Sequence, residues 1–169
     1  TELFRDYYVG DSAIANDEKQ IAKKIKKFDL ELIRKNRTLA IQGSETNIRR
    51  GIAEVIWRMN ILDIDEINRT KELNFNRYDV LFVSEQLKLI EKTLGGGIPY
   101  PYNVNIFSHL YIMISRSRKT NYQIKEIELS TEQLQSLDHE SPIYEMAMIV
   151  IQNVERYLVT RLPMNEVYY

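Results

Sequence analysis

Apolar side chains recur every three or four residues along most of this 169-residue chain, and this spacing constrains the fold more than any other feature. A period of that length places apolar residues on one face of an α-helix, where they can pack against neighbouring helices. It predicts helices with these stripes: Ile48, Ile52, Val55 and Met59; Val80, Val83, Leu87, Ile90 and Leu94; Ile143, Met146, Ala147, Val150, Val154 and Tyr157. From Gly43 onward we therefore expect an all-helical arrangement.

Loop and cap signals mark the ends of several of these helices. Gly95–Gly97 and Pro99–Pro101 predict an interhelical loop, since glycine and proline both interrupt helices. After this loop, residues 104–114 are apolar on nearly every side, which predicts a central, buried helix. Ser141–Pro142 is a good N-cap and first-turn pair for the helix that runs to about residue 159.

The first quarter of the chain has a different pattern. Residues 1–8 have the spacing of a short helix, and Asp11 and Ser12 are N-cap candidates for a second helix to about Phe28. Two short apolar segments, 30–33 and 38–42, then flank a basic turn that contains asparagine, which predicts a β-hairpin. The fold class predicted for the whole chain is mostly α: a partial winged helix-turn-helix with a β-hairpin wing, followed by an all-α bundle.

Composition excludes several classes of protein. The chain has no cysteine, which excludes a disulfide scaffold, cysteine-ligated metal sites and thiol catalysis. It has two histidines, His109 and His139, too few and too far apart to predict a metal site. No apolar run reaches transmembrane length, so we expect a cytoplasmic protein without a membrane partner.

The formal net charge of −1 hides an asymmetry along the chain. Residues 1–50 hold 11 basic and 8 acidic residues, a net of +3, whereas residues 51–169 hold 12 and 16, a net of −4. Residues 19–37 contain eight basic residues but only two acidic ones, Asp29 and Glu31, which gives this segment a net charge of +6. A basic segment on an acidic body indicates two functions in one chain.

The basic segment predicts DNA binding. Recognition helices contact bases with their N-terminal residues, while lysine and arginine neutralise phosphates nearby. The DNA-contact residues that we predict are four on one face of the helix and three at the hairpin tip: Ser12, Asn16, Lys19 and Lys23; Arg34, Lys35 and Arg37. Asp11, Asp17 and Glu18 add negative charge to the same helix and favour the alternative of a solvated surface.

One histidine lies in an unusual place. His109 falls inside the predicted buried helix, and Arg116 follows seven residues later, two helical turns on, so both project from nearly the same face. A histidine beside a guanidinium suits a site that receives a phosphoryl group. A histidine that only completes core hydrogen bonds is the alternative. No catalytic motif or phosphate-binding loop is present, so we predict neither an enzyme nor a bound cofactor.

Three segments resemble the PTS regulation domain, the helical module of BglG-type antiterminators and of related activators with a winged helix-turn-helix. They are Ile106–Arg116, with its histidine and arginine seven residues apart; Pro142–Ala147, of the form Pro-x-Tyr-x-x-Ala; and Leu162–Glu166, a Leu-Pro-x-x-Glu helix start. Upstream, Gly43–Glu45 and Arg49 resemble the segment after the hairpin in the activator branch.

This resemblance implies a role for each part of the chain. His109 would accept a phosphoryl group from proteins of the sugar phosphotransferase system, HPr or enzyme II components, and Arg116 would pair with the phosphate. The regulator would form a homodimer on promoter DNA. The domains would be residues 1–44, the winged helix-turn-helix; 45–78, a connecting helix and linker; and 79–169, a PTS regulation domain that continues in a longer protein.

Two alternatives remain open from the sequence. One is a helical dimerisation or interaction module whose winged helix does not bind DNA. The other is an RNA-binding transcriptional antiterminator, which would have a small β-rich module where residues 1–28 read as helical.

Overall fold

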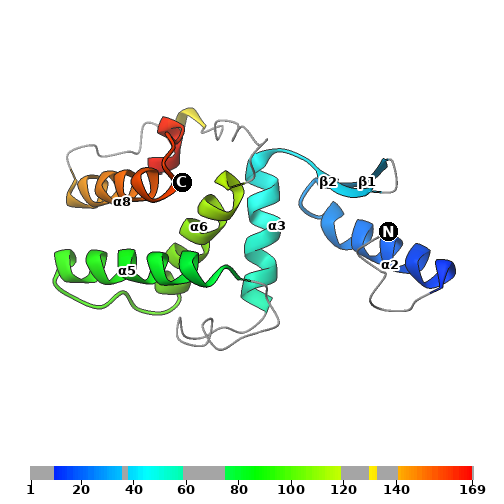
Figure 1. Ribbon diagram of the computed structural model, residues 1–169, viewed down its shortest axis with the longest axis horizontal. Coiled ribbons are helices and arrows are strands. Elements are labelled where there is room, and N and C mark those ends of the chain that lie inside the picture. The colour runs from blue at the N-terminus through cyan, green and yellow to red at the C-terminus, as the bar shows by residue number, and fades with distance from the viewer. Residues whose placement is uncertain (1–9, 36–37, 59–74, 119–129, 133–140, 169) are drawn as a thin grey trace. The chain divides into compact units, whose positions relative to one another are not determined.

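The computed structural model describes residues 10–35, 38–58, 75–118, 130–132 and 141–168 (Figure 1). In chain order its elements are α2 (Asp11–Lys26), β1 (Glu31–Lys35), β2 (Thr38–Gln42), α3 (Glu45–Arg58), α5 (Arg77–Leu94), α6 (Tyr102–Ser117), α8 (Pro142–Leu158) and the 3₁₀ helix η1 (Met164–Tyr168). The fold is mostly helical with one hairpin after the first described helix, as predicted.

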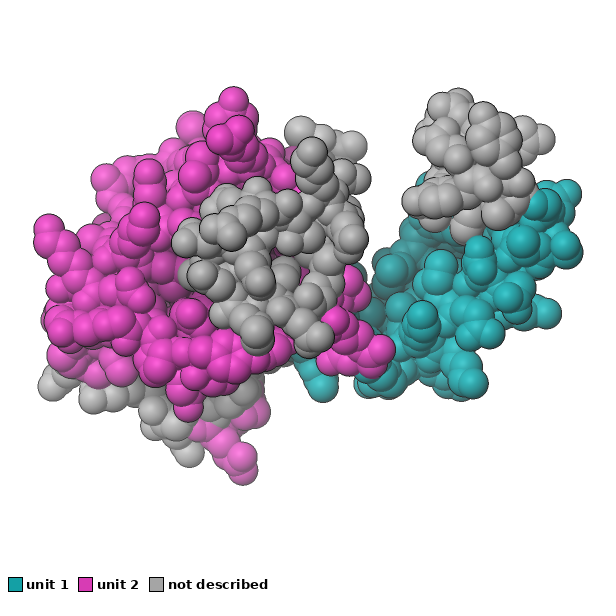
Figure 2. All heavy atoms as spheres, turned by 90° about the horizontal axis from the view of Figure 1, so that it is seen from below, with its two compact units in different colours: residues 1–52 teal, residues 53–169 magenta. Residues whose placement is uncertain are grey.

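The chain divides into two compact units, residues 1–52 (unit 1) and residues 53–169 (unit 2), coloured separately in Figure 2. The predicted helix over residues 1–8 lies outside the described residues, and so do residues 59–74 of the predicted connecting helix and linker, 45–78. The domain boundaries at residues 44 and 78 stay predictions.

In unit 1, α2 begins one residue earlier than the sequence indicates. The N-cap is Gly10, whose carbonyl accepts hydrogen bonds from the backbone N–H groups of Ala13 and Ile14 at 3.0 and 3.1 Å. The prediction of Asp11 or Ser12 as N-cap was therefore wrong. Asp11 lies instead in the first turn of the helix, where a carboxylate interacts favourably with the helix dipole.

The predicted apolar face of α2 is the inner face of unit 1. Ile14, Ile21 and Ile25 are half-buried there, and Phe28 follows in the turn after the helix. Leu30 is fully buried and packs against Gly43 and Gly51. A Cβ at Gly43 would overlap Leu30 Cδ2, so this small residue allows the close approach of the chain after the hairpin.

The hairpin is an antiparallel pair whose register runs from Glu31 opposite Gln42 to Lys35 opposite Thr38. Arg34 and Lys35, which the sequence places in the turn, are the last two residues of β1. Asp11–Lys26 is helical, so the described part of the region lacks the strands that the RNA-binding alternative would need.

The stripe predicted for α3 is not its buried face. Of the predicted residues, Ile48 is half-buried, Ile52 and Val55 are exposed, and Met59 lies outside the described residues. Glu45 and Arg49 of unit 1 and Ile56 of unit 2 are buried instead. Glu45, Arg49 and Ile56 also follow helical spacing, and this row is buried more fully than the apolar stripe.

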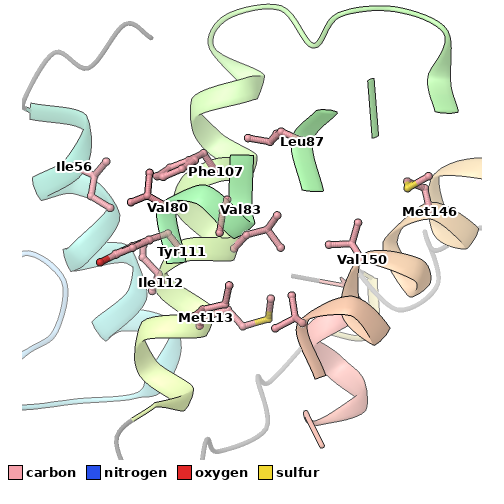
Figure 3. Close-up of a cluster of buried hydrophobic side chains, with 13 residues drawn as sticks. Ile56, Val80, Val83, Leu87, Phe107, Tyr111, Ile112, Met113, Met146 and Val150 are labelled. Carbon is pink, nitrogen blue, oxygen red and sulfur yellow. The ribbon is translucent and has the colours of Figure 1, made fainter. Parts of the chain in front are cut away.

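The core of unit 2 is formed by α5, α6, α8 and the end of α3, whose apolar side chains converge in Figure 3. The predicted stripe of α5 is confirmed for Val80, Val83 and Leu87, while Leu94 is exposed. α6 is buried nearly all round, as predicted: its buried residues are Val104, Phe107, Ser108, Leu110, Tyr111, Ile112, Met113, Ile114 and Arg116. In α8 the buried residues are Met146, Val150 and Val154, whereas Ile143 is exposed.

Polar caps fix the ends of the helices in unit 2. Asn76 Oδ1 accepts from the N–H groups of Tyr78 and Asp79, and Gly95 ends α5 in the left-handed conformation. Ser141 Oγ accepts from the N–H of Tyr144 at 3.2 Å, which confirms the predicted N-cap of α8. The Leu162–Pro163 helix start is also confirmed, since η1 follows it.

Candidate functional site

The outer face of α2 carries the predicted DNA-contact residues of that helix. Ser12, Asn16, Lys19 and Lys23 are all exposed, on the side opposite the half-buried isoleucines. The spacing of 4, 3 and 4 residues keeps them in one line along the helix. The hydroxyl of Ser12 and the amide of Asn16 thus lie near the N-terminus of α2, and the ammonium groups of Lys19 and Lys23 lie further along the helix.

The hairpin contributes two more exposed cations, Arg34 and Lys35. Arg34 Nη2 lies 3.2 Å from Glu18 Oε1 of α2, so this arginine is held by a carboxylate of the same unit. Arg37 lies outside the described residues. The structure thus brings Arg34 back to α2, a contact that the sequence analysis did not predict.

In unit 2, His109 is half-buried on α6 and lines a cavity of about 720 Å³. The wall is almost entirely apolar and comes from α5, the loop after it, α6, α8 and η1. His109 and Glu166 are the titratable groups on the described wall apart from the phenol of Tyr102. Glu166 is the last residue of the Leu-Pro-x-x-Glu motif, and its place in the cavity wall was not predicted.

Arg116 lies two turns beyond His109 and is buried, with 9% of its surface exposed. The described wall of the cavity contains neither lysine nor arginine, so Arg116 is not part of it. The predicted pairing of Arg116 with a phosphate on His109 stays a prediction.

A second polar cluster, which the sequence analysis missed, surrounds the buried carboxylate of Asp79. Arg118 donates from Nε to both carboxylate oxygens at 3.1 Å and from Nη2 to Oδ1 at 2.7 Å. The hydroxyl of Tyr157 donates to the same Oδ1 at 2.8 Å, and its ring stacks on Phe82. Burial, reinforced by the bond to Asp79, raises the pKa of Tyr157 above its ordinary value.

This cluster links three helices of the core. Asp79 belongs to α5, Arg118 follows α6 and Tyr157 is in α8, so one carboxylate joins three helices. Hydrogen bonds to Asp79 also raise the pKa of Arg118, which keeps the guanidinium charged. The only sequence signal was an acidic residue at the start of a helix, which has a simpler explanation in the helix dipole.

Within the described residues, no group of three or more histidine, aspartate or glutamate side chains could hold a metal ion. None of the described helices is both long and apolar enough to cross a membrane.

Unit 1 thus has the helix and hairpin of a winged helix-turn-helix, and unit 2 is a helical bundle. In agreement with this fold, residues 1–55 match the family model of the Mga helix-turn-helix domain. The chain is also 23% identical over 165 residues, 96% of its length, to the transcriptional regulator ManR of Bacillus subtilis (strain 168). It spans 24% of the length of that regulator.

Proposed function

We propose that this chain is part of a DNA-binding transcriptional regulator whose helical unit responds to phosphorylation of His109 by the phosphotransferase system. The observation that carries the DNA-binding part is the exposed basic face of α2 inside a segment similar to the Mga helix-turn-helix domain. The similarity to the regulator ManR extends over nearly the whole chain and supports a role in transcription.

The DNA-contact face has a definite polarity. Ser12 and Asn16, near the start of α2, would face base edges, while Lys19, Lys23 and Lys35 would neutralise phosphates. Each phosphate contact contributes about 0.9 to the slope of log affinity against log salt concentration. A surface of this kind therefore predicts binding that weakens steeply as salt rises.

Fluorescence anisotropy with a labelled 30-base-pair duplex of mixed sequence tests this surface. The double variant K19Q/K23Q should bind more weakly and lose about 1.8 from the salt slope. The matched control is K88Q/K92Q, which removes two exposed lysines from α5 of unit 2 and should bind as the wild type does. Enrichment from a random duplex library then identifies the preferred sequence. Absence of salt-dependent binding, or equal loss in both double variants, would contradict the proposal.

The regulatory part rests on the chemistry of the cavity around His109. A phosphoryl group adds about −1.5 to −2 charges and strong acceptor oxygens. On His109 it would enter an apolar cavity that also holds Glu166, without a lysine or arginine on the described wall. Phosphorylation there would disfavour the present packing of α6 against α8, which is how a charge can switch a helical unit between two states.

Phosphotransfer is tested by incubating the chain with enzyme I, HPr and radiolabelled phosphoenolpyruvate. The wild type and H139A should both become labelled, because H139A removes the other histidine of the chain and leaves His109 in place. The variant H109A should lose the label, which should be acid-labile as phosphohistidine is. Label retained by H109A, or lost in H139A, would overturn the assignment. The predicted homodimer is tested by sedimentation of the phosphorylated and the unphosphorylated chain.

A further inference from the structure

Glu18 occupies an unexpected position on α2. It falls in line with Ile14, Ile21 and Ile25, at steps of 4, 3 and 4 residues, which is the half-buried inner face of the helix and not the basic outer face. Its side chain is 18% exposed. A carboxylate thus stands where the packing of unit 1 favours an apolar side chain.

Among the described residues, one cation lies close to the shielded carboxylate oxygen of Glu18. Oε1 is shielded from solvent and accepts no hydrogen bond from the described residues. Arg34 Nη2 lies 3.2 Å from this oxygen and supplies a positive charge, although not a well-aligned hydrogen bond. A carboxylate with a shielded oxygen is disfavoured when it loses its counter-charge, whereas Arg34, with 54% of its side chain exposed, is readily solvated.

Arg34 can therefore pair with Glu18 or contact a phosphate of DNA, and these two interactions compete. A phosphate of DNA that draws the guanidinium away from α2 leaves Glu18 without its partner, and it also brings a second negative charge close to the carboxylate. Lys35, next along β1, forms no ion pair with α2 within the described residues and can follow the backbone of DNA. Building on the proposed DNA binding, we infer that Glu18 holds Arg34 as a structural counter-ion and thereby lowers the affinity of unit 1 for DNA.

The decisive test compares E18Q with D17N in the same anisotropy assay. Both variants remove one negative charge from α2, but Asp17 is exposed and E18Q alone releases Arg34. E18Q should bind the duplex about two- to fivefold more tightly than D17N and steepen the salt slope by about 0.9, one additional phosphate contact. E18L, which restores an apolar inner face, should give the same gain even if the buried amide of E18Q perturbs packing.

Substitution of Arg34 completes the cycle. R34Q in the wild-type background should change DNA affinity and salt slope little, while R34Q in the E18Q background should cancel the gain. R34Q alone should also lower the urea midpoint of the chain more than E18Q does, because it leaves the carboxylate without a partner.

The outcomes separate this inference from the proposed function. If the wild type binds DNA but E18Q matches D17N, or if R34Q alone reduces the salt slope by about 0.9, the inference is wrong and DNA binding stands. If neither the wild type nor any variant binds duplex DNA, both are wrong.

Discussion

Arg49 donates its Nε–H to Glu45 Oε1 over 2.9 Å, one turn away on α3, and both side chains are almost completely buried in unit 1. Removing one partner of a buried ion pair destabilises the fold by about 3–5 kcal/mol, because the other charge loses its counter-charge. We therefore expect E45Q and R49M each to lower the free energy of unfolding substantially. The double variant E45L/R49M should lose less stability than either single variant, because it buries apolar groups in place of two charges. Urea denaturation measures all three.

A second pair on the same helix is the control for this prediction. Arg58 Nε and Glu54 Oε1 have the same spacing and the same 2.9 Å distance, but their side chains are 66% and 36% exposed. Exposed pairs of this kind contribute about 0.3–0.5 kcal/mol. R58M should therefore shift the unfolding midpoint only slightly, and an effect as large as that of R49M would show that burial is not what matters.

The same helix shows what a sequence alone can predict. The helical spacing of α3 was predicted correctly, but its apolar residues Ile52 and Val55 are exposed and its ionic pair is inside. Spacing identifies an element and its faces; which face is buried depends on what packs against it. In α6 this ambiguity is absent, because apolar residues cover nearly all sides, and the predicted central helix is confirmed.

The candidate sites also differ in how far the sequence could predict them. The line of Ser12, Asn16, Lys19 and Lys23 on an exposed face of α2 could be predicted, because it depends on one helix only. The contact between Arg34 and Glu18 could not, since it joins a strand to a helix and depends on the register of the hairpin. The cavity at His109 depends on five separate segments and was likewise beyond a spacing argument.

Asp79 and Arg118 should respond unequally to substitution. Asp79 is 1% exposed, whereas the side chain of Arg118 is 42% exposed. Loss of Asp79 leaves a guanidinium that can turn to solvent, but loss of Arg118 leaves a buried carboxylate held by the Tyr157 hydroxyl. R118Q should thus destabilise the chain by about 2–4 kcal/mol and D79N by about 1–2 kcal/mol. Urea denaturation of both variants measures the difference.

Arg161 is the control for the Asp79 cluster. It pairs with Glu155 at 2.9 Å, but 91% of its side chain is exposed. R161Q should change stability by less than about 0.5 kcal/mol. A result in which D79N costs as much as R118Q, or more, would contradict the argument from burial.

The half-buried phenol of Tyr157 predicts a loss of stability in alkali. Burial, then the bond to Asp79, raises its pKa above the ordinary value of 10.0, so the fold favours the protonated form. This contribution is fully present below about pH 10 and is lost as the pH rises through the raised pKa. Ionisation would place a phenolate against the Asp79 carboxylate. The urea midpoint should therefore stay level to about pH 10 and then fall.

Two phenylalanine variants test the origin of this alkaline effect. Y157F loses the hydrogen bond to Asp79 and should therefore be about 1 kcal/mol less stable than the wild type at neutral pH. In alkali, however, its stability should fall less steeply than that of the wild type. Burial also raises the pKa of Tyr111, so some alkaline loss should persist. Y78F removes a phenol that is 76% exposed and should leave the pH profile as it is in the wild type. A profile unchanged in Y157F would rule out its role.

Val159 ends α8 in the left-handed conformation, at φ 53° and ψ 44°, with 90% of its surface exposed. A β-branched residue is disfavoured there by about 1–2 kcal/mol, and its exposed side chain offers little packing in return. V159G should therefore raise the free energy of unfolding by about 1 kcal/mol, because glycine adopts this conformation without strain and keeps the backbone bond to the Arg156 carbonyl. Q152G, at an exposed position inside the same helix, should instead lower stability by about 1 kcal/mol. If both glycine variants destabilise the chain equally, the left-handed cap at Val159 is not strained.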